Sequence, residues 1–214
     1  REFCGFIKVP DASKITRFKQ DFLDDLQLVS DNLVDVTEPI CQAIDSAKAD
    51  MTIFDSSGIE AFVTENNHKY ANRIIKQLKA YAKAQGFDKS YDPYKAAYGS
   101  MPSHASANPE IKQLYINGHF CYVFKFGIVT NGLGIIRHIS FYNKNFMVSH
   151  PDIVVERDIN HIKDNLCLAG RRTQNEKTLH ADLILAGITQ LITVVLADKI
   201  NHHEYIRSLK PLIT

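Results

Sequence analysis

The chain has 214 residues, of which 45% are hydrophobic and 23% are charged, and its formal net charge is +1. This composition is typical of a soluble globular protein. No run of about 18 apolar residues occurs, since Thr189, Gln190 and Thr193 interrupt the longest apolar stretch, so we expect no membrane span. The four cysteines form no C-x-x-C pair, which argues against a zinc site and favours reduced thiols in a cytoplasmic protein. The opening REFCGFIKVP has no initiator Met and no signal-peptide pattern, so we expect it to begin part-way through a domain.

The first fifty residues predict a small helical unit. Ser13 is the expected N-cap of a first helix. Residues 15–29 place apolar side chains at intervals of three and four, which is the period of an amphipathic helix. Residues 33–44 predict a second helix, with Pro39 as a break or kink near its start. Residues 1–50 carry 6 basic and 10 acidic side chains, so this unit is acidic.

The period changes from helical to β at Met51. The run MTIFD at residues 51–55 is short, apolar and rich in β-forming residues. The SSG that follows it is expected to end the strand. The sequence therefore predicts a buried strand with Asp55 at its carboxyl-terminal end.

A lysine-rich helix is expected at about residues 69–84. Residues 51–150 carry 11 basic and 6 acidic side chains, a balance of +5. This excess is compatible with a surface that faces nucleic-acid phosphates, and equally with a solvated lysine-rich helix. Under the first interpretation we expect weak, sequence-tolerant DNA binding through the basic residues of this region, including Lys69, Arg73, Lys76 and Lys79.

The next part of the chain predicts a loop and then a pair of strands. Residues 86–111 are rich in Gly, Pro, Ser, Ala and Asn, which is typical of a loop. Residues 115–129, with a break at Asn117-Gly118, and residues 134–142 carry the aromatic and β-branched content of strands. Thr130-Asn131-Gly132 between them is a hairpin-turn signal. We expect a long antiparallel hairpin.

Two helices are expected after Pro151, at about residues 159–166 and residues 179–199. The second is apolar over much of its circumference and should be buried. The predicted fold is therefore α+β. A helical N-terminal unit precedes a mixed sheet, and two C-terminal helices pack on that sheet.

An acid at the end of a first central strand, followed by a hairpin, is the opening of a ribonuclease-H-like core. In that architecture three carboxylates converge on two divalent metals, which clamp the attacking and leaving oxygens of a phosphodiester. Carboxylates suit this task because Mg²⁺ and Mn²⁺ are hard ions that prefer oxygen ligands. Asp55 is placed as the first ligand. A strand-end Asp before Ser-Ser-Gly also suits an Asx-turn or a cap, so the position alone leaves both interpretations open.

Longer motifs carry a resemblance to a known family. TIFDSSGIEAFVTENN is similar to the first-aspartate strand of DDE-type transposases from bacterial insertion sequences, and CGFIKVPDASKITRFKQDF is similar to their helical N-terminal region. The run from DPYKAAYGSMPS to HISFYNK resembles their second and third strands, and ERDINHIKDNLCLAGRR resembles the helix that carries their third acid. The resemblance covers nearly the whole chain. It implies a helical N-terminal transposase region at residues 1–50 and a truncated ribonuclease-H-like domain at residues 51–214.

The resemblance also implies roles for particular residues. Asp55 matches the first metal-binding Asp and Glu156 matches the helix-borne Glu, so both are expected to hold Mg²⁺ or Mn²⁺ and to approach each other. Taken alone, Glu156 also suits a helix N-terminal acid that the helix dipole stabilises. Arg157 and Lys163 lie in the same motif and are expected to face DNA phosphates. The implied partners are the terminal repeats of the element and the target DNA, together with a second copy of the chain in a homodimer. The implied location is the bacterial cytoplasm, in association with the nucleoid.

The chain departs from the family pattern at the second catalytic Asp. Only thirteen residues separate Tyr142 from Glu156, and Asp152 is the one acid among them. We therefore expect an internal stretch to be missing and strand cleavage to be lost. Two alternatives stay open: a non-catalytic remnant that binds DNA or associates with itself, and a small α+β interaction module with structural acids.

Overall fold

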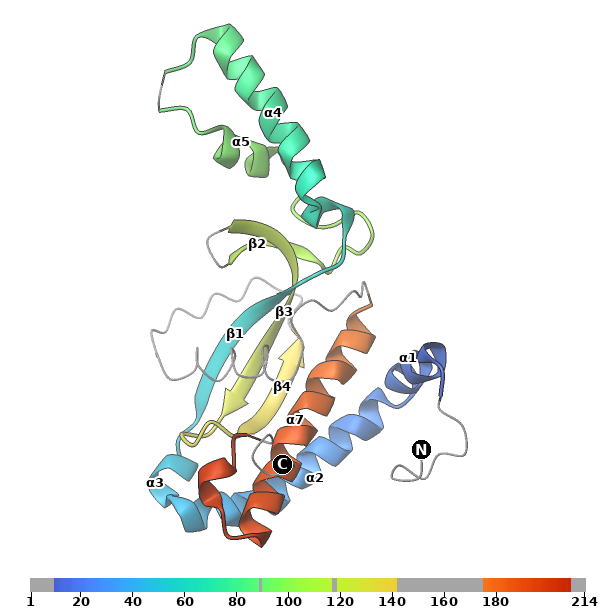
Figure 1. Cartoon of the computed structure of the whole chain (residues 1–214), viewed down its shortest axis with the longest axis vertical. Coiled ribbons are helices and arrows are strands. Elements are labelled where there is room, and N and C mark those ends of the chain that lie inside the picture. The colour runs from blue at the N-terminus through green and yellow to red at the C-terminus, as the bar shows by residue number, and fades with distance from the viewer. Residues whose placement is uncertain (1–9, 89, 117–118, 142–174, 209–214) are drawn as a thin grey trace.

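The computed structural model describes residues 10–88, 90–116, 119–141 and 175–208. These residues form an α+β fold, as the sequence predicts. Figure 1 shows three parts: a four-stranded sheet, a helical layer of α1, α2 and α7 beside it, and an arm made of α4 and α5 that projects from the sheet. Residues 142–174, which include the expected helix at 159–166, lie outside the described residues.

The N-terminal part is helical up to Ala49, as expected. Helices α1 (Ala12–Asp21) and α2 (Leu23–Ile44) are separated by a single non-helical residue, Phe22, and the short α3 (Ser46–Ala49) follows. The N-cap of α1 is Asp11, whose carboxylate accepts the Lys14 N–H, so the prediction of Ser13 was wrong; the Ser13 hydroxyl instead donates to Asp11.

Helix α2 also passes through a predicted break. Pro39 lies inside α2 rather than near the start of a separate helix. Proline removes one backbone donor from a helix. Packing of the helix against its neighbours outweighs that loss here, because Thr37 and Cys41 on either side of Pro39 are both fully buried.

The sheet is built around one long strand, β3 (His119–Thr130). The strand β1 (Ile53–Glu60) pairs antiparallel with β3 from Val123 to Thr130. Strands β2 (Lys112–Ile116) and β4 (Ile136–Phe141) also pair antiparallel with β3, at opposite ends of it. Since Val123 pairs with both β1 and β2, and Ile128 with both β1 and β4, the strands β2 and β4 share the edge of β3 that lies opposite β1.

Two strand predictions need correction. The segment expected at residues 115–129, with its break at Asn117-Gly118, is two strands that pair antiparallel, since Ile116 pairs with His119. The expected hairpin between residues 130 and 134 is confirmed as the β3–β4 connection. The SSG after Asp55 does not end β1, which continues to Glu60. Asp55 therefore lies in the first half of the strand instead of at its end.

Helix α7 (Glu176–Lys199) fits the predicted buried C-terminal helix. It is long and apolar enough to cross a membrane, but 61% of that apolar window is buried inside the protein, as in the core helix of a soluble protein. Leu179, Leu183 and Ala186 join the side chains of the sheet in the main hydrophobic cluster. A Cβ on Gly187 would lie 3.3 Å from the Ile139 Cδ1, so the helix backbone closely approaches the sheet at this point. A second cluster joins α7 to α2 through Leu191, Val194 and Cys41, and the 3₁₀ turn His203–Tyr205 follows the helix.

The arm interrupts the chain between β1 and β2. It consists of α4 (His68–Gln85), as predicted, and α5 (Pro93–Ser100), which falls in the expected loop at residues 86–111. Asp92 caps α5 by accepting the N–H groups of Tyr94 and Lys95, and Pro93 occupies the first helical position, where a missing N–H costs nothing. These two start signals outweigh the weak helix propensity of the short segment.

Candidate functional site

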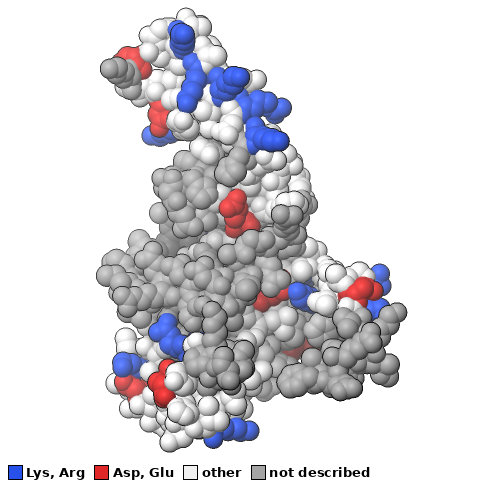
Figure 2. Space-filling model, viewed as in Figure 1, with Lys and Arg blue, Asp and Glu red and all other residues white. Residues whose placement is uncertain are grey.

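The outer face of α4 carries a row of basic side chains. Five lysines and arginines occur between His68 and Gln85, and no acid occurs in that range. All five are exposed, and Figure 2 shows Lys and Arg side chains gathered along one side of the arm. The residues are Lys69, Arg73, Lys76, Lys79 and Lys83. The four residues predicted from the sequence therefore lie together on one helix, with Lys83 as a fifth.

Aromatic neighbours orient two of these basic groups. The Arg73 guanidinium carbon lies 5.5 Å from the centroid of the Tyr70 ring. The Lys79 Nζ lies 4.6 Å from the Tyr94 centroid and donates a 2.9 Å hydrogen bond to the Tyr94 hydroxyl. Cation–π contacts at exposed sites stabilise by about 0.5–1 kcal/mol, which limits side-chain motion without neutralising the charge.

The neck of the arm, which is the 3₁₀ turn Thr64–Asn66 between β1 and α4, is fixed by one amide side chain. Asn66, in the 3₁₀ turn Thr64–Asn66, donates from its Nδ2 to the Ala61 carbonyl at 2.8 Å and to the Tyr122 carbonyl at 2.7 Å. Its Oδ1 accepts the Tyr122 N–H at 2.7 Å. The Asn66 side chain thus pairs with β3 as a strand residue would, directly beyond the end of β1.

A buried carboxylate ties the two sides of the neck together. Glu65 is 7% exposed and accepts hydrogen bonds from the N–H and the hydroxyl of Ser106, both at 2.9 Å. Burial alone would raise the pKa of Glu65, but these hydrogen bonds hold that pKa below its ordinary value. Burial and the nearby Glu65 carboxylate raise the pKa of Tyr122 to about 12. Both groups keep their ordinary charge at neutral pH, and Glu65 has a structural role.

Asp55 points to the face of the sheet that α7 covers. In β-register it stands opposite Ile128, which in turn stands opposite Ile139, and residues directly opposite each other share a face. Ile128 and Ile139 are buried in the main cluster, whereas Asp55 is half-buried at the β1 end of this row. Its Oδ1 accepts the Ser56 N–H at 2.7 Å, a contact with the next residue of the same strand and not the contact two residues on that defines an Asx-turn.

The other expected active-site residues cannot be placed beside Asp55. Glu156, Arg157 and Lys163 lie outside the described residues, as does Asp152. Among the residues that the structure describes, no group of three His, Cys, Asp or Glu side chains could hold a metal ion. The Asp55 carboxylate has the hard oxygen atoms that Mg²⁺ and Mn²⁺ prefer, whereas a two-metal site needs further carboxylates beside it.

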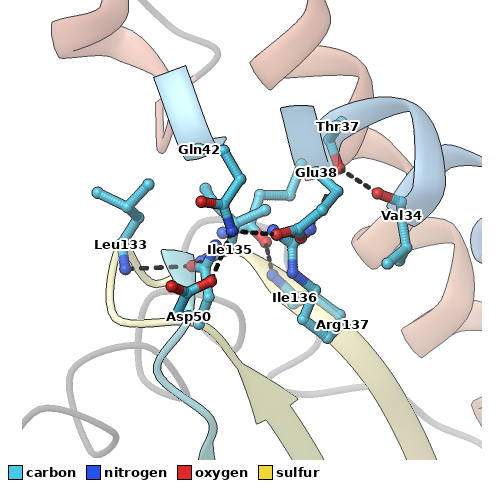
Figure 3. Close-up of polar contacts among 11 residues, drawn as sticks. Val34, Thr37, Glu38, Gln42, Asp50, Leu133, Ile135, Ile136 and Arg137 are labelled. Atoms are coloured by element: carbon cyan, nitrogen blue, oxygen red, sulfur yellow. Dashed lines mark hydrogen bonds and ion pairs between the residues drawn. The ribbon is translucent and has the colours of Figure 1, made fainter. Parts of the chain in front are cut away.

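A polar cluster that the sequence interpretation missed joins α2 to β4 (Figure 3). Gln42 donates from one amide nitrogen to Glu38 at 2.9 Å and to Asp50 at 2.7 Å. The Glu38 carboxylate also pairs with Arg137, whose Nη2 lies 2.6 Å from Glu38 Oε2. Because these acids satisfy neighbouring donors, the cluster fastens the helical layer to the sheet and offers no chemistry of its own.

The same region holds the β3–β4 turn. The Asn131 Oδ1 accepts the N–H groups of Leu133 at 3.1 Å and Ile135 at 3.0 Å. Gln190 of α7 accepts the Ile136 N–H and donates to the Gly134 carbonyl, both at 3.0 Å. The interruption of the apolar stretch of α7 by Gln190 was the one sequence signal for this contact.

Comparison of the chain with protein-family models, with curated proteins and with solved structures finds no match. The functional interpretation therefore rests on the chemistry of the residues and on their geometry in this fold. Two features carry it: the acid-free basic face of α4 on a projecting arm, and Asp55 on the helix-covered face of the sheet.

Proposed function

We propose that this chain is a transposase polypeptide of the DDE type that binds DNA through α4 and has lost strand cleavage. The observation that carries the DNA-binding part is the acid-free basic face of α4. The transposase part is supported by the motifs around Asp55. It is also supported by the antiparallel order β1–β3–β4, which is the order expected at the start of a ribonuclease-H-like core.

Duplex DNA is the partner that suits this face best. A duplex carries one negative charge per about 1.7 Å of its axis, and basic side chains that contact it release condensed counterions. From Lys69 to Lys83 the face extends over fourteen residues, or about 21 Å of helix. Several phosphates can therefore be neutralised at once. The arm that carries α4 projects from the sheet (Figure 1).

The catalytic centre, under this proposal, would be held by Asp55 and Glu156. A divalent metal bound there would supply Lewis-acid stabilisation of the attacking and leaving oxygens of a phosphodiester. The negative charge of two carboxylates does not balance the positive charge of two dications. The middle acid of the family pattern, which would add to it, is missing from the chain. Asp152 directly follows Pro151 in the sequence and precedes Glu156 by four residues. It is the first candidate for a substitute ligand.

DNA binding tests the proposal through its dependence on salt. The full chain is titrated into a fluorescent duplex of about 30 base pairs, and anisotropy gives the affinity between about 50 and 200 mM salt. Each phosphate contact contributes about 0.9 to the slope of log affinity against log salt. We expect Lys69→Gln/Lys76→Gln to weaken binding and to lower that slope by about 2.

A matched control separates local contact from net charge. Lys177 and Lys199 are also exposed helix lysines, and Lys177→Gln/Lys199→Gln removes the same charge from α7. This variant should keep the slope of the wild-type chain. A slope near zero for the wild-type chain, or equal losses in both variants, would favour the interpretation of α4 as a solvated helix and overturn the proposal.

A further inference from the structure

The basic face of α4 contains two residues that phosphate binding does not require. Asn72 and Ala80 are both exposed, and at 3.6 residues per turn they fall among the basic residues instead of beside them. Six exposed side chains share about 100° of the helix circumference. They are Lys69, Asn72, Arg73, Lys76, Ala80 and Lys83. Asn72 and Arg73 lie at the two edges of this face, about 100° apart, and Ala80 lies between them with the three lysines.

The helix is positioned to present this face outwards. Its inner side is held by Ile75, which is buried, and by Tyr70 and Ile74, which pack against the main hydrophobic cluster. Arg73 lies over the Tyr70 ring, and Tyr70 is itself anchored in that packing. In the described part of the chain, Asn72 makes no hydrogen bond that would occupy its amide. Asn72 and Arg73 are thus two donors on a rigid support, consecutive in the sequence and about 100° apart around the helix.

These residue types match the edges of base pairs. An Asn amide can bind adenine N6 and N7 together, an Arg guanidinium can bind guanine O6 and N7, and an Ala methyl can contact the methyl group of thymine. An α-helix with its side chains is about 10–12 Å across, and the major groove is about 12 Å wide. A helix that only followed a phosphate backbone would gain nothing from Asn72.

We propose that α4 is a major-groove recognition helix in which Asn72 and Arg73 read two base pairs while Lys69, Lys76 and Lys83 contact phosphates. This inference rests on the proposed function, because it takes DNA as the partner of α4, and it replaces sequence-tolerant binding with sequence preference. The face is about 21 Å long, which corresponds to about six base pairs of duplex. Adenine and guanine are the bases expected at the two positions that are read.

Selection from a random duplex library tests the proposal. The full chain is incubated with the library at about 100 mM salt, and bound duplexes are recovered and sequenced over several rounds. We expect the wild-type chain to enrich a short motif. Asn72→Ala should lose the preference at its adenine, with a fall of about tenfold or more in affinity for the selected duplex, and should keep the salt slope. Lys76→Gln should keep the motif and lower the slope by about 1.

A second amide on α4 provides the control. Gln85 is exposed and lies about 140° around the helix from Asn72, so Gln85→Ala should change neither the motif nor the slope. Salt-dependent binding without an enriched motif would overturn base reading and leave the proposed function standing. Retention of the full motif by Asn72→Ala would also overturn it. If the wild-type chain fails to bind duplex DNA, the proposed function falls together with this inference.

Discussion

Lys19 of α1 and Asp182 of α7 form an ion pair across 163 residues of sequence, with 2.5 Å between the Lys19 Nζ and the Asp182 Oδ1. The side chains are 15% and 6% exposed, so the pair lies largely inside the protein. Next to it, Gln20 donates to the Thr178 hydroxyl at 2.9 Å. These contacts attach the N-terminal helices to the C-terminal one, and the two ends of the chain stabilise a shared layer.

We expect Lys19→Met to destabilise the chain by about 3 kcal/mol, because it removes a cation that pairs with the buried Asp182. The double variant Lys19→Met/Asp182→Leu should recover much of that loss, since it removes both charges and keeps apolar volume. Urea unfolding of the wild-type chain, the two single variants and the double variant gives the coupling energy. A double variant as unstable as the sum of the single ones would refute a direct pairing.

His180 should make stability depend on pH. Its Nε2 is buried without a hydrogen-bond partner among the described residues, and its ring lies 4.8 Å from that of Phe141. Burial lowers the pKa of His180 below its ordinary value, His138 lowers it further, and Asp24 opposes the shift. The unfolded chain therefore binds this proton more tightly. The contribution to stability is present above about pH 6.5 and is lost as the pH falls through the folded-state pKa.

The measurement is the free energy of unfolding in urea at about pH 7.5 and pH 5.5. His180→Phe should reduce the difference between the two values, because it removes the group that takes up the proton. An unaltered difference in His180→Phe would assign the pH dependence to other groups.

Asn66→Ala should loosen the neck of the arm. The substitution removes three hydrogen bonds and leaves the Tyr122 N–H without its acceptor, at a cost of about 1–3 kcal/mol. Amide hydrogen exchange at Tyr122 should become faster. Asn67→Ala is the matched control, since it removes only the N-cap of α4, at a cost of about 1 kcal/mol, and does not touch Tyr122. Equal exchange at Tyr122 in both variants would show that Asn66 does not fix the neck.

Strand cleavage is expected to be absent. The assay is Mn²⁺-dependent nicking of a DNA that carries the ends of the element, with Asp55→Ala as the control. Under the proposed function both proteins should leave the DNA intact, because the middle acid of the family pattern, which would balance the charge of the second metal ion, is missing. Robust cleavage by the wild-type chain that disappears in Asp55→Ala would prove this wrong, and Asp152 would then be the next residue to replace.

Elements with a strong period could be predicted from the sequence. Helices α4 and α7 follow from their apolar spacing, and β3 and β4 from their β-branched and aromatic residues on either side of Asn131-Gly132. The basic face of α4 was predicted as a set of residues, and the structure confirms that they share one helix. Asn72, which is exposed on the same helix, was not predicted as part of this face, because a count of charged residues does not include a neutral amide.

Other elements depend on contacts that no local pattern reveals. Gly58 was interpreted as a strand terminator, but a Cβ there would lie 2.8 Å from a Val123 side-chain carbon, so this glycine permits the Val123 side chain of β3 to approach β1 closely. Helix α5 was not predicted, because its segment contains many small residues. The local signal for it is the N-cap Asp92. The neck could not be predicted from a local sequence pattern, because Asn66 forms its hydrogen bonds with Tyr122, 56 residues away.

The neck has a mechanical consequence for the arm. The 18 residues of α4 make a rod about 27 Å long whose base lies next to Asn66. A rotation of roughly 5° about that base would move the far end of the helix by about 2 Å, which exceeds the range of about 0.5 Å over which hydrogen-bond distances vary. The orientation of α4 thus depends on a few polar contacts at its base.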